Sequence, residues 1–404
     1  MIYDVVIIGG GASGLMAGCV CKEKKLNTII IEKNSKIGRK ILSTGAGKCN
    51  ISNLNISADS YLTDDPKKLS NVFNKLTPDK LLSFINHKLG IMTVVKEKGK
   101  IFPVSENAAT VVNAFDIFLR NKNIEILTLT HAIGVKKEKD FFEIKLKTLP
   151  HNFEKKNFKE KNFTLKSKKL IISSGGPSYP RIGGSAWGYE ILKGFGHSII
   201  DLYPLIVPFN VESPSFKILD GLRMNAKVTL ENGIVIEDEI LFTDYGISGP
   251  FALELSYYYK DIDMIEIELM SEISEKEMID FFIKREDKNL SAVDFFKSVF
   301  DPKFVEFLIH NKIISENQRY SDELARYLVS YIKKFKLYNL SVCGFDLGMS
   351  KRGGVSFKEV NENFESTKVK NLFLTGEILN VCGKSGGYNL HFAFTSGYLS
   401  GLSI

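Results

Sequence analysis

The sequence predicts an α/β protein: a parallel sheet begins at the N-terminus and is later interrupted by an antiparallel β segment and an α-helical segment. Three observations support this class. Val5 to Ile8 is a short apolar run of β-branched residues, typical of a buried parallel strand. Within residues 198–272 and 337–357, short strands alternate with turns such as Glu231-Asn232-Gly233. Residues 273–336 are almost free of glycine and have the apolar spacing of several helices.

The first predicted strand runs into a glycine turn with the spacing G-x-G-x-x-G. Gly9 makes the tight turn, and Gly11 lets an anionic group approach the backbone because it has no Cβ. Gly14 lets the next helix pack closely on the sheet. That helix is expected from about Ala12 to Lys24, with free N–H groups and a positive dipole end at its start. The turn therefore predicts a pyrophosphate site.

A second buried strand, Ile29 to Ile31, ends in Glu32. A carboxylate at this position can accept hydrogen bonds from both hydroxyls of a ribose and would repel a 2′-phosphate. A glycine turn alone is weak evidence. The strand, helix, strand and acidic residue together predict a Rossmann-like domain that binds an adenine dinucleotide.

Residues 33–53 contain a second glycine-rich stretch, which is not a P-loop because Cys49 follows Lys48. It also carries Arg39 and Lys40. Such a loop can wrap a dinucleotide, with the cations near the diphosphate and Asn50 near a polar ring. The alternative is a mobile basic loop on the surface.

A chain of 404 residues is too long for one core and predicts two or three domains. The dinucleotide-binding domain is expected at 1–197 and 358–404, an inserted β domain at 198–272 and 337–357, and a helical domain at 273–336. In the first domain, residues 141–146 and 163–165 are expected to form a hairpin. A separate buried strand, 169–172, precedes Gly175-Gly176, and its end would lie beside the first glycine turn in a doubly wound sheet. Residues 342–349 are expected to resume the β pattern.

The last informative stretch is a buried strand that begins at Asn371 and ends in Gly376-Glu377. A glycine-rich loop then leads into a helix from about Tyr388 to Leu402. The N-terminus of that helix could stabilise negative charge that develops on a bound ring.

Composition narrows the class further. The net charge of +7 comes without a basic motif interleaved with aromatic residues, which disfavours nucleic acid as a partner. No apolar run reaches membrane-spanning length. Five cysteines without disulfide spacing fit a reducing cytoplasm, and no His/Cys cluster has zinc spacing. We therefore expect a cytoplasmic protein with no membrane partner, no metal and a small-molecule substrate, and the sequence leaves the oligomeric state open.

The two glycine-rich ends together resemble the glutathione-reductase-like FAD fold. More closely, nearly the whole chain resembles a bacterial FAD-dependent oxidoreductase family that includes aminoacetone oxidase and a flavoprotein of the bile-acid-inducible operon. The specific motifs are Gly38-Arg39-Lys40 through Asn50, Phe102-Pro103, residues 175–180 (Gly-Gly-Pro-Ser-Tyr-Pro), Ser248-Gly249-Pro250 after Leu241-Phe242-Thr243, and Gly386-Gly387-Tyr388-Asn389-Leu390.

The resemblance implies noncovalent FAD and a set of binding residues. The diphosphate would lie on Gly9, Gly11, Ala12, Ser13 and Gly14, and the ribose end on Glu32 and Lys33. The residues expected to line the rest of the cofactor are Arg39, Lys40, Thr44, Gly45, Asn50, Ala132, Ser174, Gly175, Gly376, Glu377, Gly387, Asn389 and Leu390. Ala132 would offer its backbone to adenine, and Gly376, Glu377, Asn389 and Leu390 would lie by the ribityl chain and flavin ring.

The sequence departs from the family pattern near the expected working face of the flavin. Trp187 stands at an acidic position, Cys382 where an acidic or small polar residue is common, and His391 where glutamine is common. Candidates for contact with substrate are Lys384, Tyr388, His391 and Cys382. For His391 the alternative is a core histidine with one hydrogen bond. A thiol–disulfide role for Cys49 and Cys382 is disfavoured, since they lack the close spacing such enzymes use.

The flavin carries the redox chemistry, so no catalytic triad is needed. Three functions are open at this stage. The leading one is hydride transfer between FAD and a small organic substrate in a cleft between the domains, with NAD(P)H as a transient reductant. The second is an amine oxidase that passes electrons to oxygen. The third is a non-catalytic FAD-containing RNA-binding or scaffolding protein.

Overall fold

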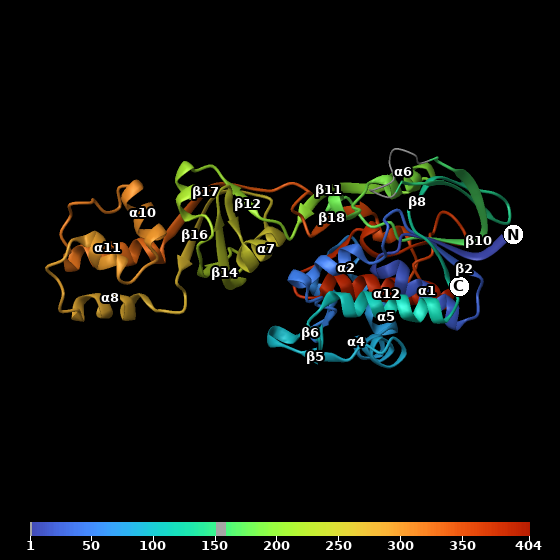
Figure 1. Cartoon of the computed structure of the whole chain (residues 1–404), viewed down its shortest axis with the longest axis horizontal. Helices are drawn as coiled ribbons and strands as arrows, with labels where there is room; N and C mark the ends of the chain where they lie inside the picture. Colours follow the sequence, from blue (N-terminus) through green and yellow to red (C-terminus); the bar gives the residue numbers. More distant parts are fainter. Residues whose placement is uncertain (1, 151–158) are drawn as a thin grey trace. The chain divides into compact units, whose positions relative to one another are not determined.

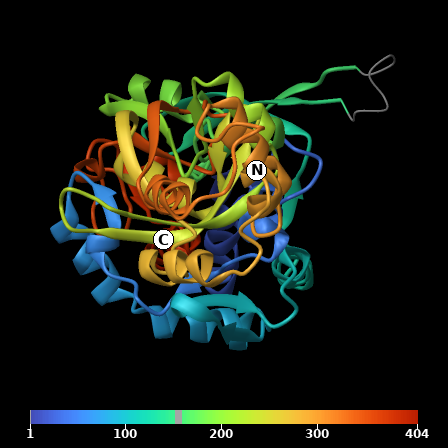
Figure 2. The same ribbon diagram turned by 90° about the vertical axis from the view of Figure 1, so that its left-hand side faces the viewer.

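The computed structural model describes residues 2–150 and 159–404, so part of the polar stretch between the two expected hairpin strands lies outside it. Clustering of contacts divides the chain into two compact units, one of Met1–Tyr203 with Met349–Ile404 and one of Pro204–Gly348. Both can be followed by colour in Figure 1 and, after a 90° turn, in Figure 2. We call them unit 1 and unit 2. The three-domain boundaries remain a prediction.

Unit 1 is built on a seven-stranded sheet with the order β7-β2-β1-β10-β9-β8, in which β19 also pairs with β10. The strands are β1 (Ile2–Ile8), β2 (Thr28–Ile31), β7 (Glu125–Leu127), β8 (Thr130–Lys137), β9 (Phe142–Thr148), β10 (Asn162–Ile172) and β19 (Leu372–Leu374). β7, β2, β1, β10 and β19 are parallel, whereas β8 and β9 are antiparallel additions. The predicted Rossmann-like fold class is therefore confirmed.

The expectation of two separate strands at 163–165 and 169–172 is wrong, because both belong to the single strand β10. Its first half pairs antiparallel with β9, from Asn162 to Ser167. Its second half pairs parallel with β1, from Lys166 to Ile172. One strand thus carries the alternating pattern of a hairpin and the continuous apolar pattern of a sheet centre.

The carboxyl ends of β1, β2, β10 and β19 lie at one edge of the sheet, as their parallel registers require. The Oγ of Ser173, just after β10, donates to the carbonyls of Ile8 and Gly9 at 3.0 Å each. The end of β10 therefore lies beside the first glycine turn, as expected for a doubly wound sheet.

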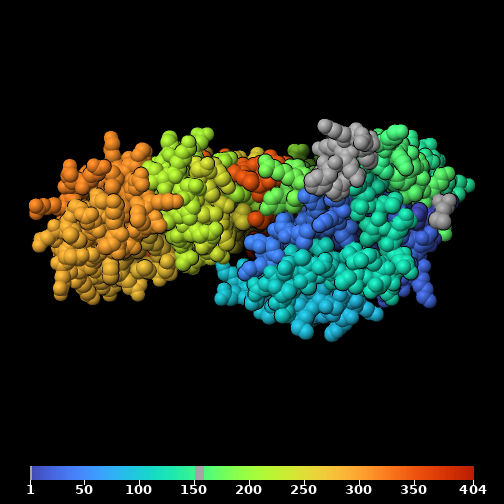
Figure 3. Space-filling model, viewed as in Figure 1, coloured from blue at the N-terminus to red at the C-terminus, as the bar shows by residue number. Residues whose placement is uncertain are grey.

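Helices α1 (Ala12–Glu23), α12 (Tyr388–Ser403) and α5 (Ala108–Asn121) lie side by side in Figure 1. Phe115 of α5 stacks on Phe394 of α12 with ring centroids 5.7 Å apart. At Gly397 the backbones of α12 and α1 meet, since a Cβ there would lie 2.2 Å from the carbonyl oxygen of Ser13. In Figure 3, part of α5 and the hairpin of β5 (Thr93–Val95) and β6 (Lys100–Pro103) lie at the surface of unit 1, and Val95 and Ile117 are exposed.

The other elements of unit 1 connect these layers. The α-helices are α2 (Arg39–Ser43), α3 (Pro66–Lys75), α4 (Pro78–Ser83) and α6 (Trp187–Gly194), and the short 3-10 helices include Phe357–Glu359 and Gly376–Ile378. The strands are β3 (Ser52–Asn53), β4 (Tyr61–Thr63), β5 (Thr93–Val95), β6 (Lys100–Pro103), β11 (Ile199–Leu205), β18 (Ser350–Val355) and β20 (Val381–Gly383).

Unit 2 contains a closed antiparallel barrel with the strand order β12-β15-β14-β13-β16-β17. The strands are β12 (Phe209–Val211), β13 (Arg223–Thr229), β14 (Val235–Thr243), β15 (Gly246–Ser248), β16 (Asp261–Leu269) and β17 (Phe335–Val342). The helices are α7 (Gly249–Tyr258), α8 (Glu275–Lys284), α9 (Ala292–Lys297), α10 (Pro302–His310) and α11 (Asp322–Lys333). The expected antiparallel β and helical segments are both present.

The expectation of a strand at 342–349 is wrong, because the strand in this region, β17, ends at Val342. β17 begins at Phe335, directly after α11, and buries Phe335, Leu337 and Leu340. Asn339 has a φ of 52°, which shifts the buried alternation by one residue. Because the buried positions do not alternate regularly, the sequence pattern did not indicate this strand.

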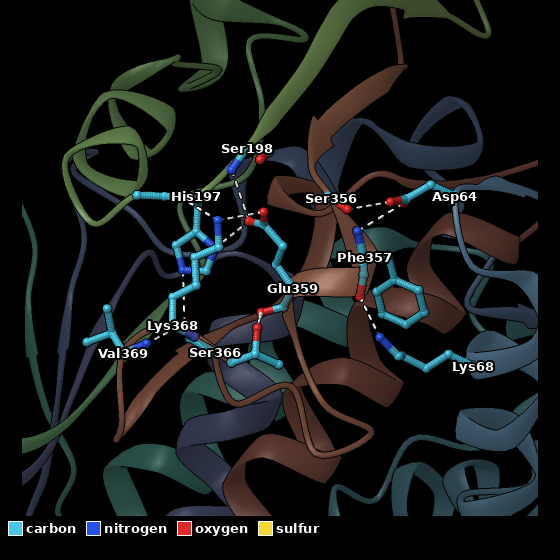
Figure 4. Close-up of polar contacts among 12 residues, drawn as sticks. Asp64, Lys68, His197, Ser198, Ser356, Phe357, Glu359, Ser366, Lys368 and Val369 are labelled. Atoms are coloured by element: carbon cyan, nitrogen blue, oxygen red, sulfur yellow. Dashed lines mark hydrogen bonds and ion pairs between the residues drawn. The ribbon is translucent and has the colours of Figure 1, made fainter.

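A buried polar cluster joins the start of β11 to the segments that flank the 3-10 helix Phe357–Glu359 (Figure 4). His197 contacts Glu359 Oε2 through Nδ1 at 2.8 Å and Ser366 Oγ through Nε2 at 2.9 Å. This order resembles a hydrolase triad, but Ser366 Oγ is buried and also accepts the backbone N–H groups of Lys368 and Val369. The hydroxyl has no freedom to attack a substrate, so the cluster is structural.

We expect Gly397→Ala to destabilise the protein by about 3 kcal/mol, because the new methyl would collide with the backbone of α1. The matched control is Gly194→Ala in α6, where a Cβ meets nothing within 4 Å. That variant should be neutral or gain up to about 1 kcal/mol of helix propensity. Urea unfolding of the two variants measures the difference. Equal stabilities would contradict the close approach of α12 to α1.

Candidate cofactor site

The first glycine turn is shaped on one side by the sheet and open on the other. Gly9 has a φ of 114°, and a Cβ there would lie 2.3 Å from the Ser173 carbonyl oxygen. A Cβ on Gly14 would lie 1.9 Å from the Gly9 oxygen. At Gly11, the residue that precedes α1, a Cβ would meet nothing within 4 Å. The structure thus has open space in front of the helix N-terminus, where an anionic group can reach backbone N–H groups.

Glu32 is buried at the end of β2 and fixed against this turn. Its Oε2 accepts the Gly10 N–H at 2.8 Å, and its Oε1 accepts the N–H and Nδ2 of Asn34 at 2.7 and 2.8 Å. Asn34 in turn accepts a hydrogen bond from Arg39 at 3.2 Å. The carboxylate is held in place, and Oε2 keeps a lone pair for a further donor.

Ala132 and Lys33 lie near the same end of the sheet. The Thr130 N–H, two residues before Ala132 on β8, donates to the Glu32 carbonyl at 3.0 Å. Burial lowers the pKa of Lys33, while the charge of Glu32 opposes that shift. The structure therefore brings together the residues that the sequence assigned to the adenosine end.

The C-terminal Thr-Gly-Glu lies against the start of α1. Ser13 Oγ donates to the Thr375 carbonyl at 3.5 Å, although the two residues are 362 positions apart in the sequence. A Cβ on Gly376 would lie 2.5 Å from Ser13 Oγ, and the Gly376 N–H donates to Ser396 Oγ of α12 at 2.9 Å. The two glycine-rich ends of the chain therefore form one site.

Three charged side chains meet behind this site. Lys40 Nζ lies 2.8 Å from Glu377 Oε2. Lys351 of β18 is wholly buried, and its Nζ donates to the carbonyls of Gly353 and of Leu379, the latter at 2.9 Å. Burial opposes ionisation of Glu377, but the charges of Lys40 and Lys351 hold its pKa below the usual value. The carboxylate is therefore ionised.

Lys351 was missed by the sequence analysis. It lies in the short strand Ser-Lys-Arg-Gly-Gly-Val, where Lys351 is buried and the next residue, Arg352, is exposed. A charged residue in a strand directly before two glycines was the available signal, but nothing in the sequence indicates which of Lys351 and Arg352 points inward.

Several buried polar atoms around this site lack a hydrogen-bond partner. They are Asn50 Oδ1, Ser174 Oγ, Glu377 Oε1 and Trp187 Nε1. Asn50 Oδ1 faces the turn before α12, since a Cβ on Gly387 would lie 2.8 Å from it. Buried polar atoms in folded proteins are normally paired, so these four fit a ligand that supplies the missing partners. The residues present thus fit a polar dinucleotide with a heteroaromatic ring.

Thr44, Gly45 and Asn389 are nearby but already engaged in the protein. Thr44 Oγ1 donates to the Ile41 carbonyl at 2.7 Å, and Gly45 has a φ of 56° in the loop that leads to Asn50. Asn389 binds Gly383 through both atoms of its amide, at 2.9 and 2.8 Å, and so shapes the loop before α12. Leu390 is half-buried on the same turn.

The candidates for contact with substrate have mixed surroundings. Burial raises the pKa of Cys382 to about 11, and its Sγ lies 3.2 Å from Ser350 Oγ. Burial also raises the pKa of Cys49 to about 11. Both remain thiols at neutral pH, which argues against attack by a thiolate. Lys384 is partly exposed, and Tyr388 is buried with its carbonyl bonded to the Tyr61 hydroxyl at 2.8 Å.

His391 is fully buried in α12. Its Nδ1 pairs with Ser52 Oγ at 2.8 Å, and its ring packs edge-on against Phe73. Burial lowers the pKa of the imidazole to about 3. The surroundings are those of a neutral core histidine.

This arrangement is that of a Rossmann-like dinucleotide-binding oxidoreductase. The family model described as "HI0933-like protein Rossmann domain" matches residues 3–403, and the chain belongs to this family. Within residues 2–150 and 159–404, no helix is long and apolar enough to span a membrane.

Two kinds of relative align with the full chain. One is the 3-dehydro-bile acid delta(4,6)-reductase of Clostridium scindens, 29% identical over 98% of this chain and 97% of the relative. The others are ribosomal RNA dihydrouridine synthases. The Escherichia coli enzyme is 26% identical to this chain, and the alignment covers 98% of this chain and 96% of the relative. The Haemophilus influenzae enzyme is 28% identical, and the alignment covers 99% of this chain and 98% of the relative.

Solved structures share the fold. The 3-ketosteroid-delta4-(5alpha)-dehydrogenase of Rhodococcus jostii matches with a TM-score of 0.52 at 11% identity, covering 99% of this chain and 96% of its own. The 3-ketosteroid delta1-dehydrogenase of Sterolibacterium denitrificans matches with a TM-score of 0.50 at 10% identity, covering 99% and 98%. The family and the fold identify the chain as an FAD-dependent oxidoreductase, as the sequence predicted.

The only tryptophan of the chain, Trp187, gives a direct test of the site. Its ring packs edge-on against His131, the neighbour of Ala132, and its buried Nε1 lacks a partner. We expect FAD added to apoprotein to quench the tryptophan emission with a 1:1 end point, because the flavin absorbs where tryptophan emits. Binding of FAD, seen by its own absorbance, with no change in Trp187 emission would contradict this placement of the site.

His391→Gln should reduce the acid sensitivity of the fold. The folded pKa of about 3 lies below the unfolded value of 6.5, so between these values only the unfolded chain binds the proton. Stability of the wild type should therefore fall by roughly 1.4 kcal/mol per pH unit as pH drops below 6.5, through this group alone. Urea unfolding of both proteins at pH 7 and pH 5 measures the difference. Identical pH slopes would show that His391 is accessible to protons in the fold.

Proposed function

We propose that this chain uses FAD to reduce a carbon–carbon double bond conjugated to a carbonyl group, with NAD(P)H as the reductant. The observation that carries this proposal is the chemistry common to the names of its full-length relatives. A 3-dehydro-bile acid with delta(4,6) unsaturation and a uracil ring both contain a double bond conjugated to a carbonyl. Reduction adds a hydride to one carbon and a proton to the other.

The described residues support a role in which the flavin alone transfers electrons. FAD supplies the two-electron chemistry when bound. The buried cysteines stay protonated, and no group of three or more His, Cys, Asp or Glu side chains in the described ranges could hold a metal ion. The chain's own part is to bind and orient the cofactor and to stabilise negative charge near the N-terminus of α12.

We propose the cofactor contacts residue by residue. Gly9, Gly11 and the start of α1 bind the diphosphate, since the open side of the turn lies there. Glu32 binds the ribose. The turn at Gly376-Glu377 and the Asn50 amide contact the ribityl chain and the flavin ring, because Glu377 and Asn50 each carry an unpaired buried oxygen.

The substrate class has two candidates. The bile-acid reductase relative favours a small conjugated ketone as the substrate. The two dihydrouridine synthase relatives favour a uridine of ribosomal RNA. An amine oxidase that passes electrons to oxygen is the competing function.

Rapid mixing of the oxidised flavoprotein with NADH or NADPH, without other substrate, tests the reductant. We expect the flavin absorbance to bleach in a single exponential with one of the two nucleotides. Absence of bleaching with both, together with bleaching by a small amine, would favour the oxidase instead.

The reduced protein then tests the substrate class anaerobically. Reoxidation by a steroid-like dienone but not by unmodified ribosomal RNA supports the small-molecule candidate. Appearance of dihydrouridine in nucleosides digested from that RNA supports the other. Bleaching followed by reoxidation with neither would contradict the reduction of a conjugated double bond.

A further inference from the structure

Lys351 is a buried cation without a place among the proposed cofactor contacts. Its side chain lies beneath the Gly175-Gly176 turn, since a Cβ on Gly176 would sit 3.1 to 3.3 Å from three of its carbons. Its Nζ donates to the carbonyl of Leu379, just after Glu377, and to that of Gly353. The lysine thus underlies the two turns, at the ends of β10 and β19, that face the cofactor site.

Two backbone carbonyls cannot neutralise an ammonium group. Burial of a charge without a partner is costly, and a methionine would fill the same volume at no such cost. The compensating charge is Glu377, which also pairs with Lys40. The three groups therefore carry a net charge of +1, and Glu377 Oε1 is unpaired and buried.

We propose that Lys351 is a positioning and electrostatic residue for the flavin: acting through Glu377, its charge makes reduction of the bound FAD more favourable. A net positive charge beside a redox group favours the state with more electrons. This role requires only that the chain binds FAD and holds for either substrate class.

The charge of Lys351 is also sensitive to pH. Burial lowers the pKa of its ammonium to about 8, against the attraction of Glu377. The other groups that face it are the Cys382 thiol and Lys40, with the Tyr189 ring 5.9 Å from Nζ. The effect of Lys351 should be present at pH 7 and decline as the pH rises through 8.

The test is the midpoint potential of the FAD-loaded protein, measured by equilibration with a reference dye. Lys351→Gln removes the charge and keeps a hydrogen-bond donor, whereas Lys351→Met removes both. The matched control is Lys68→Gln, because Lys68 also donates to two backbone carbonyls of unit 1, those of Phe357 and Val360 at 3.0 and 2.8 Å.

At pH 7 we expect both Lys351 variants to shift the equilibrium about tenfold toward oxidised flavin, which is about 30 mV for a two-electron couple. Lys68→Gln should leave it unchanged, and the gap between wild type and Lys351→Gln should narrow above pH 8. A purely structural role would spare Lys351→Gln and shift only Lys351→Met. An unchanged potential in Lys351→Gln would overturn the proposal.

If the Lys351 variants fold but lose FAD, a second substitution tests the same proposal. Glu377→Gln removes the carboxylate of the group and, measured at pH 6 so that Lys351 keeps its proton, should shift the equilibrium toward reduced flavin. An unchanged or opposite shift in Glu377→Gln would equally overturn the proposal. Quenching of Trp187 emission reports FAD binding in each variant independently of activity.

Discussion

The cofactor site depends on one close approach, that of the last helix to the first. Gly397 brings the backbone of α12 onto Ser13, and Gly376 brings the turn after β19 onto the Ser13 side chain. These contacts place Glu377 and the N-terminus of α12 beside the turn that begins α1. Any side chain larger than hydrogen at either glycine would separate the two halves of the site.

This approach also sets the electrostatics. The helix start at α1 offers positive partial charge, and the Lys40, Glu377 and Lys351 group adds a net positive charge behind it. Glu32 is the balancing anion on the other side, held by the Gly10 N–H and by Asn34. Opposite charges at opposite ends suit a ligand with a neutral sugar at one end and an electron-accepting ring at the other.

Much of this was predictable from the sequence because local signals were strong. The glycine spacing, the carboxylate at the end of β2 and the Thr-Gly-Glu after β19 each follow from the chemistry of a strand end. What failed depended on partners far away in sequence. β10 could not be recognised as one strand, since its two halves pair with β9 and β1 in opposite directions. The inward direction of Lys351 depends on Gly176 and Leu379, which only the fold brings together.

The two polar clusters of unit 1 differ in how completely their buried atoms are hydrogen-bonded. In the His197 cluster every polar atom near the hydroxyl is paired, and Glu359 keeps a pKa of about 2 because hydrogen bonds from Lys368, the Ser198 N–H and His197 outweigh its burial. Glu377 Oε1 and Asn50 Oδ1, by contrast, are buried oxygens without a hydrogen-bond partner. Complete pairing stabilises a fold, whereas unpaired buried atoms that converge on one open space indicate where a ligand completes the structure. The unpaired buried atoms therefore support our proposal of a cofactor site at the Glu377 end of the sheet, although the His197 cluster has the more familiar arrangement.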